Sequence, residues 1–328
     1  MRFLILALLA VAPMLARSEP LTLLNEPMTL ELPDGVLQGT LLLPRHERPV
    51  PVALLIAGSG PTDRNGNQPM MHNDALKRLA QALASRGIAS LRYDKRGVGQ
   101  SQAAAPDEQN LTLDNYVADA QGWSRRLQDD PRFSALILMG HSEGALVASL
   151  AAPFIEPAAV ISVAGAGRPI GSLLRQQLQG RLPPPLLANA QYLIGELEAG
   201  REQPEVPQAL QVLFRPSVQP YLISLFRQDP AQALAAVQAP VLIIQGTHDI
   251  QVETADAEAL KRAKPDATLA LIDGMNHVLR IVPPGRNEQT ASYNEPERPL
   301  ARALAERIVS FLVDEGIMPP SSSAAPRR

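Results

Sequence analysis

The amino-acid sequence predicts an α/β fold, in which a mostly parallel central sheet has helices on both faces and a helical insertion forms a cap. Short apolar runs that suit buried strands alternate with segments whose apolar residues recur at helical spacing. The chain has 328 residues, of which 45% are apolar, so it can bury a sizeable core. The alternation stops between residues 168 and 237 and then resumes, which indicates that helices are inserted into the sheet-forming part.

The first part of the sheet-forming region is expected over residues 19–167. Apolar and polar residues alternate over 28–44 around a Pro-Asp-Gly turn, which is typical of a β-hairpin. Four apolar runs suit buried strands: 50–58, 88–94, 134–140 and 158–167. Three segments are expected to be helical: 73–87, 112–128 and 143–153. Asn73 or Asp74 can cap the first of these helices, and Gly87 can end it.

The second part of the sheet-forming region is expected over residues 238–317. Strands are predicted at 239–246 and 267–274, and helices at 254–263 and 297–314. The cap, residues 168–237, is rich in Leu, Gln and Pro, and helical fragments are predicted at 171–180, 186–198 and 218–227. Residues 318–328 are expected to form a disordered tail. We find no internal repeat.

Residues 1–18 predict a cleaved signal peptide. Arg2 gives a positively charged start, residues 3–15 form an apolar run, and Ala16-Arg17-Ser18 places small residues at the spacing that a signal peptidase requires. The apolar run is too short to span a bilayer and has no polar face. The mature chain is therefore expected to begin near Glu19 and to be periplasmic or secreted.

Composition excludes several classes of function. The formal net charge is -3 and the charges are spread along the chain, so nucleic acid and anionic membrane surfaces are not expected partners. The chain has no cysteine, which excludes disulfides and thiolate metal sites. Its five histidines are scattered without metal-ligand spacing, so neither a metal nor another cofactor is expected. Stable membrane insertion is not expected either, and the oligomeric state is left open.

A single serine lies between two glycines in Gly140-His141-Ser142-Glu143-Gly144, where a predicted strand meets a small-residue helix. A nucleophile at such a turn is held clear of the sheet, at the positive end of the helix. Glycine on both sides removes side chains that would collide with the crowded backbone. An ordinary Gly-containing turn is the alternative, but the strand before and the helix after favour a nucleophile.

This motif in this setting resembles the α/β-hydrolase family, and the resemblance extends from the first hairpin to the last helix. It implies an α/β-hydrolase fold and a base just after the last predicted strand, where His277 lies. His248 is the main rival, because it adjoins an acid. The other three histidines are interpreted as a surface residue, a turn residue and a packing group: His46, His72 and His141.

The resemblance also implies an acid that orients the base and two backbone amides that bind an oxyanion. Asp249 follows the strand before the base and is the predicted acid, with Asp273 as a weaker competitor. The predicted oxyanion donors are the amides of Glu143 and Ser59. Many family members carry His-Gly where this chain has Ala57-Gly58, so their usual anchoring of this loop is missing.

Two charged loops have less specific interpretations. The loop Gly-Ser-Gly-Pro-Thr-Asp-Arg resembles the branch of secreted serine esterases and serine-aminopeptidase-like hydrolases. Within it, Asp63 and Arg64 either form an ion pair that holds the loop or contact substrate. The segment Tyr-Asp-Lys-Arg-Gly-Val-Gly-Gln-Ser resembles a family loop in which Asp94 and Arg96 brace the backbone. It lacks the residues of a phosphate cradle or a dinucleotide fingerprint.

Together these features predict a serine hydrolase that cleaves a small-molecule carboxylic ester through an acyl-enzyme, with Ser142, His277 and Asp249 as its catalytic triad. The same triad could serve a serine aminopeptidase or a thioesterase. For an aminopeptidase, four acidic residues of the cap could bind a substrate amine: Glu196, Glu198, Glu202 and Glu205. A binding module without catalysis is a further alternative, although the triad residues occur in the expected order.

Overall fold

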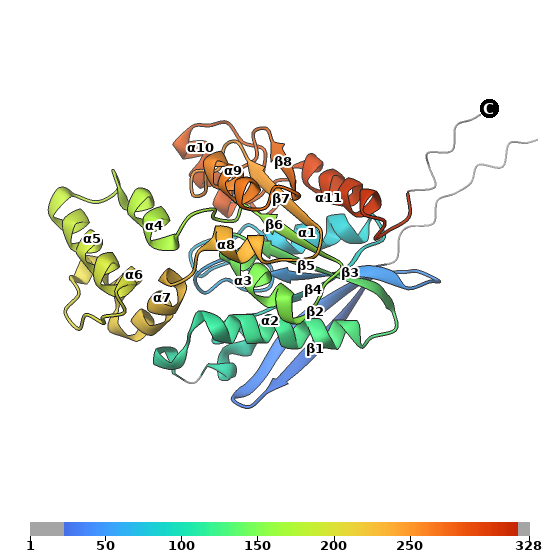
Figure 1. Cartoon of the computed structure of the whole chain (residues 1–328), viewed down its shortest axis with the longest axis horizontal. Helices are drawn as coiled ribbons and strands as arrows, with labels where there is room; N and C mark the ends of the chain where they lie inside the picture. The colour runs from blue at the N-terminus through green and yellow to red at the C-terminus, as the bar shows by residue number, and fades with distance from the viewer. Residues whose placement is uncertain (1–22, 106, 321–328) are drawn as a thin grey trace, which may run out of the picture.

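A computed structural model of the chain describes residues 23–105 and 107–320, and its centre is an eight-stranded sheet (Figure 1). The strands are β1 Leu23–Leu32, β2 Gly35–Pro44, β3 Val50–Ile56, β4 Ala89–Tyr93, β5 Phe133–His141, β6 Ala159–Val163, β7 Val241–Gly246 and β8 Thr268–Ile272. Their spatial order is β1-β2-β4-β3-β5-β6-β7-β8. The pairings β1–β2 and β2–β4 are antiparallel and all later ones are parallel. The predicted signal peptide and the tail from residue 321 lie outside the described residues.

Helices connect the strands and also form the cap. The α-helices are α1 Ala75–Ala84, α2 Leu113–Gln128, α3 Glu143–Ala151, α4 Ile170–Leu178, α5 Pro184–Glu198, α6 Gln211–Phe214, α7 Gln219–Phe226, α8 Pro230–Ala235, α9 Thr254–Ala263, α10 Arg286–Ala291 and α11 Arg302–Asp314. Short 3-10 helices cover Gly99–Ala104, Glu108–Asn110, Ala152–Phe154, Gln208–Leu210, Pro216–Val218 and Ser292–Asn294. None of the helices in the described ranges is long and apolar enough to cross a membrane.

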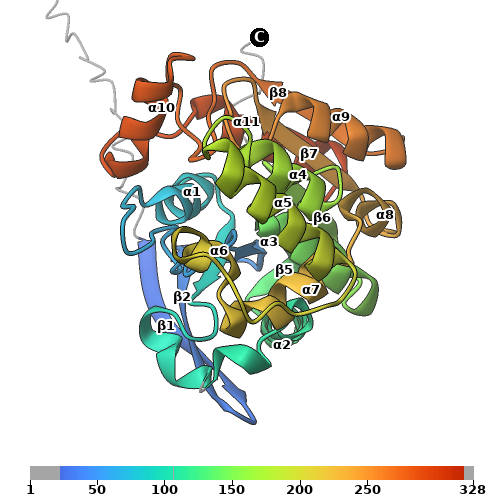
Figure 2. The same cartoon turned by 90° about the vertical axis from the view of Figure 1, so that its left-hand side faces the viewer.

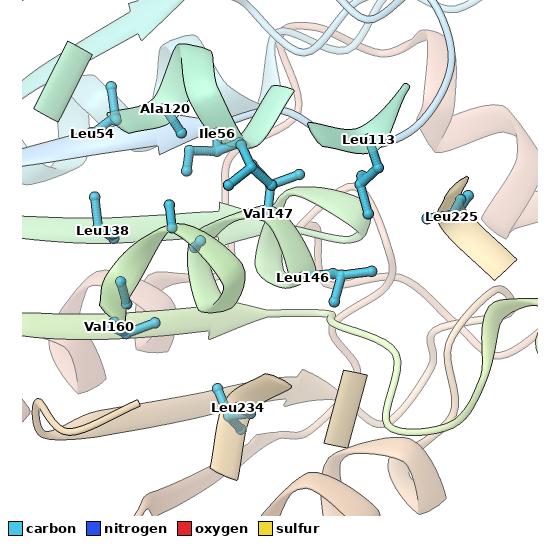
Figure 3. Packing of buried hydrophobic residues seen from close by; sticks show 14 of the residues in the cluster. Leu54, Ile56, Leu113, Ala120, Leu138, Leu146, Val147, Val160, Leu225 and Leu234 are labelled. Atoms are coloured by element: carbon cyan, nitrogen blue, oxygen red, sulfur yellow. The ribbon is translucent and has the colours of Figure 1, made fainter. Parts of the chain in front are cut away.

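The parallel strands inside the sheet are largely buried on both faces because helices cover each side, whereas the edge strand β8 is partly exposed. In β7, Val241 and Ile243 pack into the core that contains α2, α3, α8 and α9. Leu242 and Ile244 point the other way, into the core that contains α1 and α11. Figure 3 shows the first of these cores, where α3 lies over the central strands and Val147 packs near Ile56. This two-sided burial explains why the strand sequences are continuously apolar.

The interval between β6 and β7 contains only helices and their connections, as predicted for residues 168–237. Figures 1 and 2 show α4, α5, α6 and α7 gathered together on one side of the sheet. The cap begins after β6 and ends before β7, which is hydrogen-bonded to β6. It is therefore a single continuous insertion between neighbouring strands.

Several parts of the structure differ from the sequence prediction, and the short cap helices α6 and α8 were not predicted. The last helix begins at Arg302 rather than near residue 297, because Pro296 and Pro299 disfavour helical backbone in the residues before them. The helix α10 was not predicted, since its sequence Arg-Asn-Glu-Gln-Thr-Ala has no apolar periodicity. At the start of α1, the side chain of Asn73 caps the amide of Ala75 at 2.9 Å.

Candidate active site

Ser142 lies at the turn between β5 and α3, and its backbone is in an unusual conformation. Its φ of 56° and ψ of -122° are strained for a residue with a side chain, which costs on the order of 1–3 kcal/mol. A Cβ at Gly140 would lie 2.0 Å from the Gly144 carbonyl oxygen, and one at Gly144 would lie 2.2 Å from the Ile56 carbonyl oxygen. The predicted reason for the two glycines is therefore confirmed: the turn has no room for side chains beside the serine.

The predicted acid and base meet at the carboxyl ends of two neighbouring strands, β7 and β8. The His277 Nδ1 atom lies 2.8 Å from Asp249 Oδ2, and both side chains are buried. Asp249 Oδ1 accepts hydrogen bonds from the amides of Gln251 at 2.8 Å and Val252 at 3.0 Å. Burial alone would raise the pKa of Asp249, but His277 and these two amides outweigh it and lower the pKa below its usual value.

The loops that carry the acid and the base pack directly against each other. The amide of His248 donates to the Met275 carbonyl at 3.0 Å. A Cβ at Gly246 would lie only 2.0 Å from the same carbonyl oxygen, so glycine is required where β7 ends. This close contact fixes the separation of Asp249 and His277.

Ser142 and His277 line the same small cavity, whose volume is about 60 Å³, and Ser59 lines it as well. The chain at Gly58 passes close to the serine, since a Cβ there would lie 3.1 Å from Ser142 Cβ. In the part of the chain that the structure describes, the amides of Ser59 and Glu143 donate to no protein acceptor. Both predicted oxyanion donors are thus left available beside the serine.

The other candidates for the base and the acid lie away from the cavity at Ser142. His248 Nδ1 is bonded to the Val282 carbonyl at 2.6 Å, and Asp273 accepts from the Thr247 hydroxyl at 3.1 Å. His72 has a largely exposed side chain that lies 3.8 Å from Asp74. His46 is exposed, and none of these histidines lines the cavity at Ser142.

His141 does more than the packing role predicted for it. Its Nε2 atom donates to the carbonyl of His277 at 2.8 Å, and the two rings lie 4.9 Å apart. Burial, reinforced by the nearby His277 ring, lowers the pKa of His141 to about 4, so it stays neutral at pH 7. His141 therefore anchors the backbone that carries the candidate base. Its place immediately before Ser142, at the end of a central strand, was the available sequence signal.

The two charged loops brace the backbone through ion pairs and hydrogen bonds. Arg64 pairs with a different acid from the one suggested by the sequence. Asp94 pairs with Arg64 at 2.6 Å, and Arg96 pairs with Asp119 at 2.8 Å, as expected of bracing residues. The suggested pair of Asp63 with Arg64 is wrong, because Asp63 instead accepts from the amides of the next turn. Neither residue lines a cavity beside Ser142, so substrate contact is not supported.

A larger cavity, about 460 Å³ in volume, opens beside Ser142 between the cap and the sheet. Most of its lining is apolar, and part of that apolar lining comes from α3, α4 and α7: Leu146, Ile170, Leu173, Leu174, Leu222 and Phe226. Glu143 is the only acidic residue in the described lining, and it lies next to Lys95. In residues 23–105 and 107–320, no group of three or more His, Asp or Glu side chains could hold a metal ion.

A mostly parallel sheet with a strained serine at a strand-to-helix turn, and an acid–base pair at the neighbouring strand ends, defines the α/β-hydrolase class. The family described as "Serine aminopeptidase, S33" matches residues 70–281, which is more than half of the chain. The chain therefore belongs to this family of α/β hydrolases. The matched range includes Ser142, Asp249 and His277.

Individual relatives agree with this assignment. Esterase EstD from Thermotoga maritima is 29% identical over 247 residues, which cover 74% of this chain and 58% of EstD. The chain thus spans less than two thirds of that relative. Est1E from Butyrivibrio proteoclasticus, solved with ferulic acid, has a TM-score of 0.60 at 16% identity and covers 89% of this chain and 100% of Est1E. The alpha/beta hydrolase GrgF from a Penicillium species has a TM-score of 0.57 at 20% identity, covering 90% and 99%. These two structures support the fold.

Proposed function

We propose that this chain hydrolyses small-molecule carboxylic esters through an acyl-enzyme. Ser142 Oγ attacks the acyl carbon while His277 Nε2 takes the hydroxyl proton. The amides of Ser59 and Glu143 stabilise the oxyanion, and His277 returns the proton to the leaving alcohol. Water then enters, gives a proton to His277 and attacks the acyl carbon, which releases the acid and restores Ser142. Asp249 holds the ring of His277 and stabilises its protonated form.

One observation carries this proposal: a strained serine shares a small cavity with a histidine whose other ring nitrogen is bonded to a buried carboxylate. Because Nδ1 of His277 faces Asp249, Nε2 is the ring nitrogen left for the serine proton. No cofactor is needed for this chemistry, since the nucleophile, the base and the oxyanion donors are all protein groups.

The substrate that we propose is an ester with an apolar group. Support comes from the 460 Å³ cavity, whose apolar lining reaches Ser142 and could bury a chain of several carbons. The similarity to EstD, which is named as an esterase, agrees with an ester bond.

The test is turnover of p-nitrophenyl esters of graded chain length, together with labelling by a fluorophosphonate. Ser142→Ala should abolish labelling and lower kcat by several orders of magnitude, on the order of 10⁴ or more. Ser149→Ala is the matched control, because that hydroxyl lies on α3 but is bonded to the Ala145 carbonyl. Wild-type protein that neither labels nor turns over any ester would overturn the proposal and favour a binding module.

An aminopeptidase is the second candidate, because the family description names that activity. Two of the cap acids that could bind a substrate amine are engaged with arginines: Glu196 pairs with Arg201 at 2.7 Å, and Glu198 with Arg175 at 2.6 Å. No cap acid lines the described cavity at Ser142. We therefore expect a nitrophenyl ester to be cleaved much faster than an aminoacyl nitroanilide. A thioester substrate would distinguish thioesterase activity in the same assay.

We further propose that the chain is exported after cleavage near Glu19. The support is the charge and apolar pattern of residues 1–18. Mass spectrometry of the N-terminus in the periplasmic and secreted fractions tests it. Full-length protein confined to the cytoplasm would contradict export.

A further inference from the structure

Lys95 is a buried cation that the proposed chemistry has not used. It lies in the loop after β4, and only 3% of it is exposed. Its Nζ atom donates to the Gly58 carbonyl at 2.7 Å and lies 3.8 Å from Glu143 Oε1. The same ammonium lies 5.0 Å from the ring centre of Tyr116. The two segments that it joins are those with the candidate oxyanion donors.

The bond to Gly58 acts directly on the amide of Ser59, because the Gly58 carbonyl and the Ser59 N–H belong to one peptide unit. In a planar trans peptide these two groups point in opposite directions. A hydrogen bond that fixes the carbonyl therefore also fixes the direction of the N–H. A cation on the carbonyl in addition polarises the peptide, which strengthens the N–H as a donor.

The second contact of Lys95 concerns the other donor segment. Glu143 supplies the second oxyanion amide, and its side chain is held near Lys95 with 5% of its surface exposed. The neighbours of Lys95 are engaged elsewhere: Asp94 with Arg64, and Arg96 with Asp119. Of these three consecutive charged residues, Lys95 alone is directed at the oxyanion segments.

Burial destabilises the charged form of Lys95. It lowers the pKa of Lys95, and Glu143 only partly restores it. A buried ion pair often contributes less stability than apolar side chains of the same size. A role in orienting the site explains the lysine better than a role in stability alone.

We propose that Lys95 is a positioning residue whose ammonium orients the Ser59 and Glu143 amides toward the oxyanion. It anchors the Gly58–Ser59 peptide from behind, through its bond to the Gly58 carbonyl. This inference rests on the proposed ester hydrolysis.

The first test compares Lys95→Met with Lys264→Met for a p-nitrophenyl ester. Lys264 is a matched control: it is also buried, pairs with Asp266 at 3.0 Å, and precedes β8 at the end of the sheet opposite Ser142. Lys95→Met should lower kcat roughly 10- to 100-fold and leave KM within about 3-fold, because the oxyanion forms only during reaction. Inhibition by a trifluoromethyl ketone, which forms an oxyanion adduct with serine, should weaken by the same factor as kcat/KM. Lys264→Met should change none of these values.

Loss of Lys95 leaves the Glu143 carboxylate buried without a cation, so the single variant could fail to fold. The double variant Lys95→Met with Glu143→Gln removes both charges and should show the same selective loss of kcat. Unchanged kcat in either folded variant, or a rise in KM alone, would overturn the inference. A wild-type protein without esterase activity would instead overturn the proposed function and, with it, this inference.

The second test uses the absence of cysteine from the natural sequence. Lys95→Cys introduces one thiol, whose thiolate can be alkylated with 2-bromoethylamine in urea, with loss of bromide. The product is a lysine analogue with sulfur in place of one methylene. After refolding, the alkylated protein should recover most of the lost kcat, whereas alkylation with ethyl bromide should not. Equal recovery with both reagents would contradict a role for the ammonium. Wild-type protein taken through the same steps controls for refolding.

Discussion

At the scale of single residues, His141 couples the nucleophile turn to the loop of the candidate base. Its ring reaches the backbone carbonyl of a residue 136 positions later in the chain. This bond needs a neutral ring with its proton on Nε2, because a carbonyl oxygen only accepts. Protonation of His141 would place a second positive charge close to His277 whenever His277 is protonated as well. The lowered pKa keeps the pair from repelling each other.

The stability of the protein should fall as the pH is lowered from about 6.5 to about 4. In this window the unfolded chain binds a proton at His141 that the folded chain does not, so acid favours unfolding. We expect His141 to contribute a loss of about 1–3 kcal/mol between pH 7 and pH 4. Urea denaturation at both pH values measures it. Glutamine in His141→Gln keeps a donor for the carbonyl but cannot titrate. The variant should therefore lose about 1–3 kcal/mol less folding stability than the wild type between pH 7 and pH 4.

Asp249 acts in a different pH window. Its pKa is lowered, so its contribution to stability is complete above the ordinary aspartate range and is lost only as the pH falls through its folded value. The difference between wild type and His141→Gln above pH 4 therefore isolates the histidine. Equal pH dependence of the two proteins would show that His141 is not held neutral.

At the scale of secondary-structure elements, the contact of α3 with β3 leaves no room for a side chain at Gly144 in the nucleophile turn. Gly144→Ala places a methyl group 2.2 Å from the Ile56 carbonyl oxygen, so the helix must move away from the strand and take Ser142 with it. We expect a destabilisation of about 1–3 kcal/mol and a loss of kcat of roughly 100-fold. Thermal unfolding and ester turnover measure the two effects.

Gly195→Ala is the matched control for that substitution. Gly195 lies within α5, where the nearest atom outside that helix to the added methyl group would be an Arg175 side-chain nitrogen at 3.9 Å. Alanine in a helix is favoured over glycine by roughly 0.5–1 kcal/mol, so this variant should be as stable as the wild type or slightly more. If both variants had the wild-type melting temperature and kcat, the proposed steric constraint at Gly144 would be wrong.

The sequence predicts most elements because the buried strands are short continuous apolar runs, whereas the apolar residues of the longer helices recur at helical spacing. It also predicts the placing of Ser142, Asp249 and His277, since each follows a strand whose end is marked by the pattern. The polar helix α10 has no such pattern, and two prolines delay α11. The bonds of His141 and Lys95 join residues 136 and 37 positions apart, so the local sequence does not reveal their partners.

At the scale of the whole molecule, the cap and the sheet together enclose the cavity that should select the substrate. Leu222→Trp, from α7, would fill part of the 460 Å³ beside Ser142. Each acyl methylene that no longer fits in the cavity loses about 0.8 kcal/mol of hydrophobic binding free energy. We expect kcat/KM to fall roughly 10-fold or more for an octanoate ester and to stay within about 3-fold for an acetate ester.

Leu24→Trp is the control for added bulk, because Leu24 is 45% exposed on the hairpin strand β1. It should leave the ratio of octanoate to acetate turnover unchanged. An unaltered ratio in Leu222→Trp as well would mean that the acyl chain binds outside this cavity.

The cap leaves the sheet at β6 and re-enters at the adjacent β7, which pairs with β6 from Val160 and Val241 onward. The two ends of the cap are thus held side by side by the hydrogen bonds between β6 and β7, whatever the length or shape of the segment between them. A change in the length or sequence of this one stretch therefore need not alter the pairing of β6 with β7, which holds the two strand ends in place.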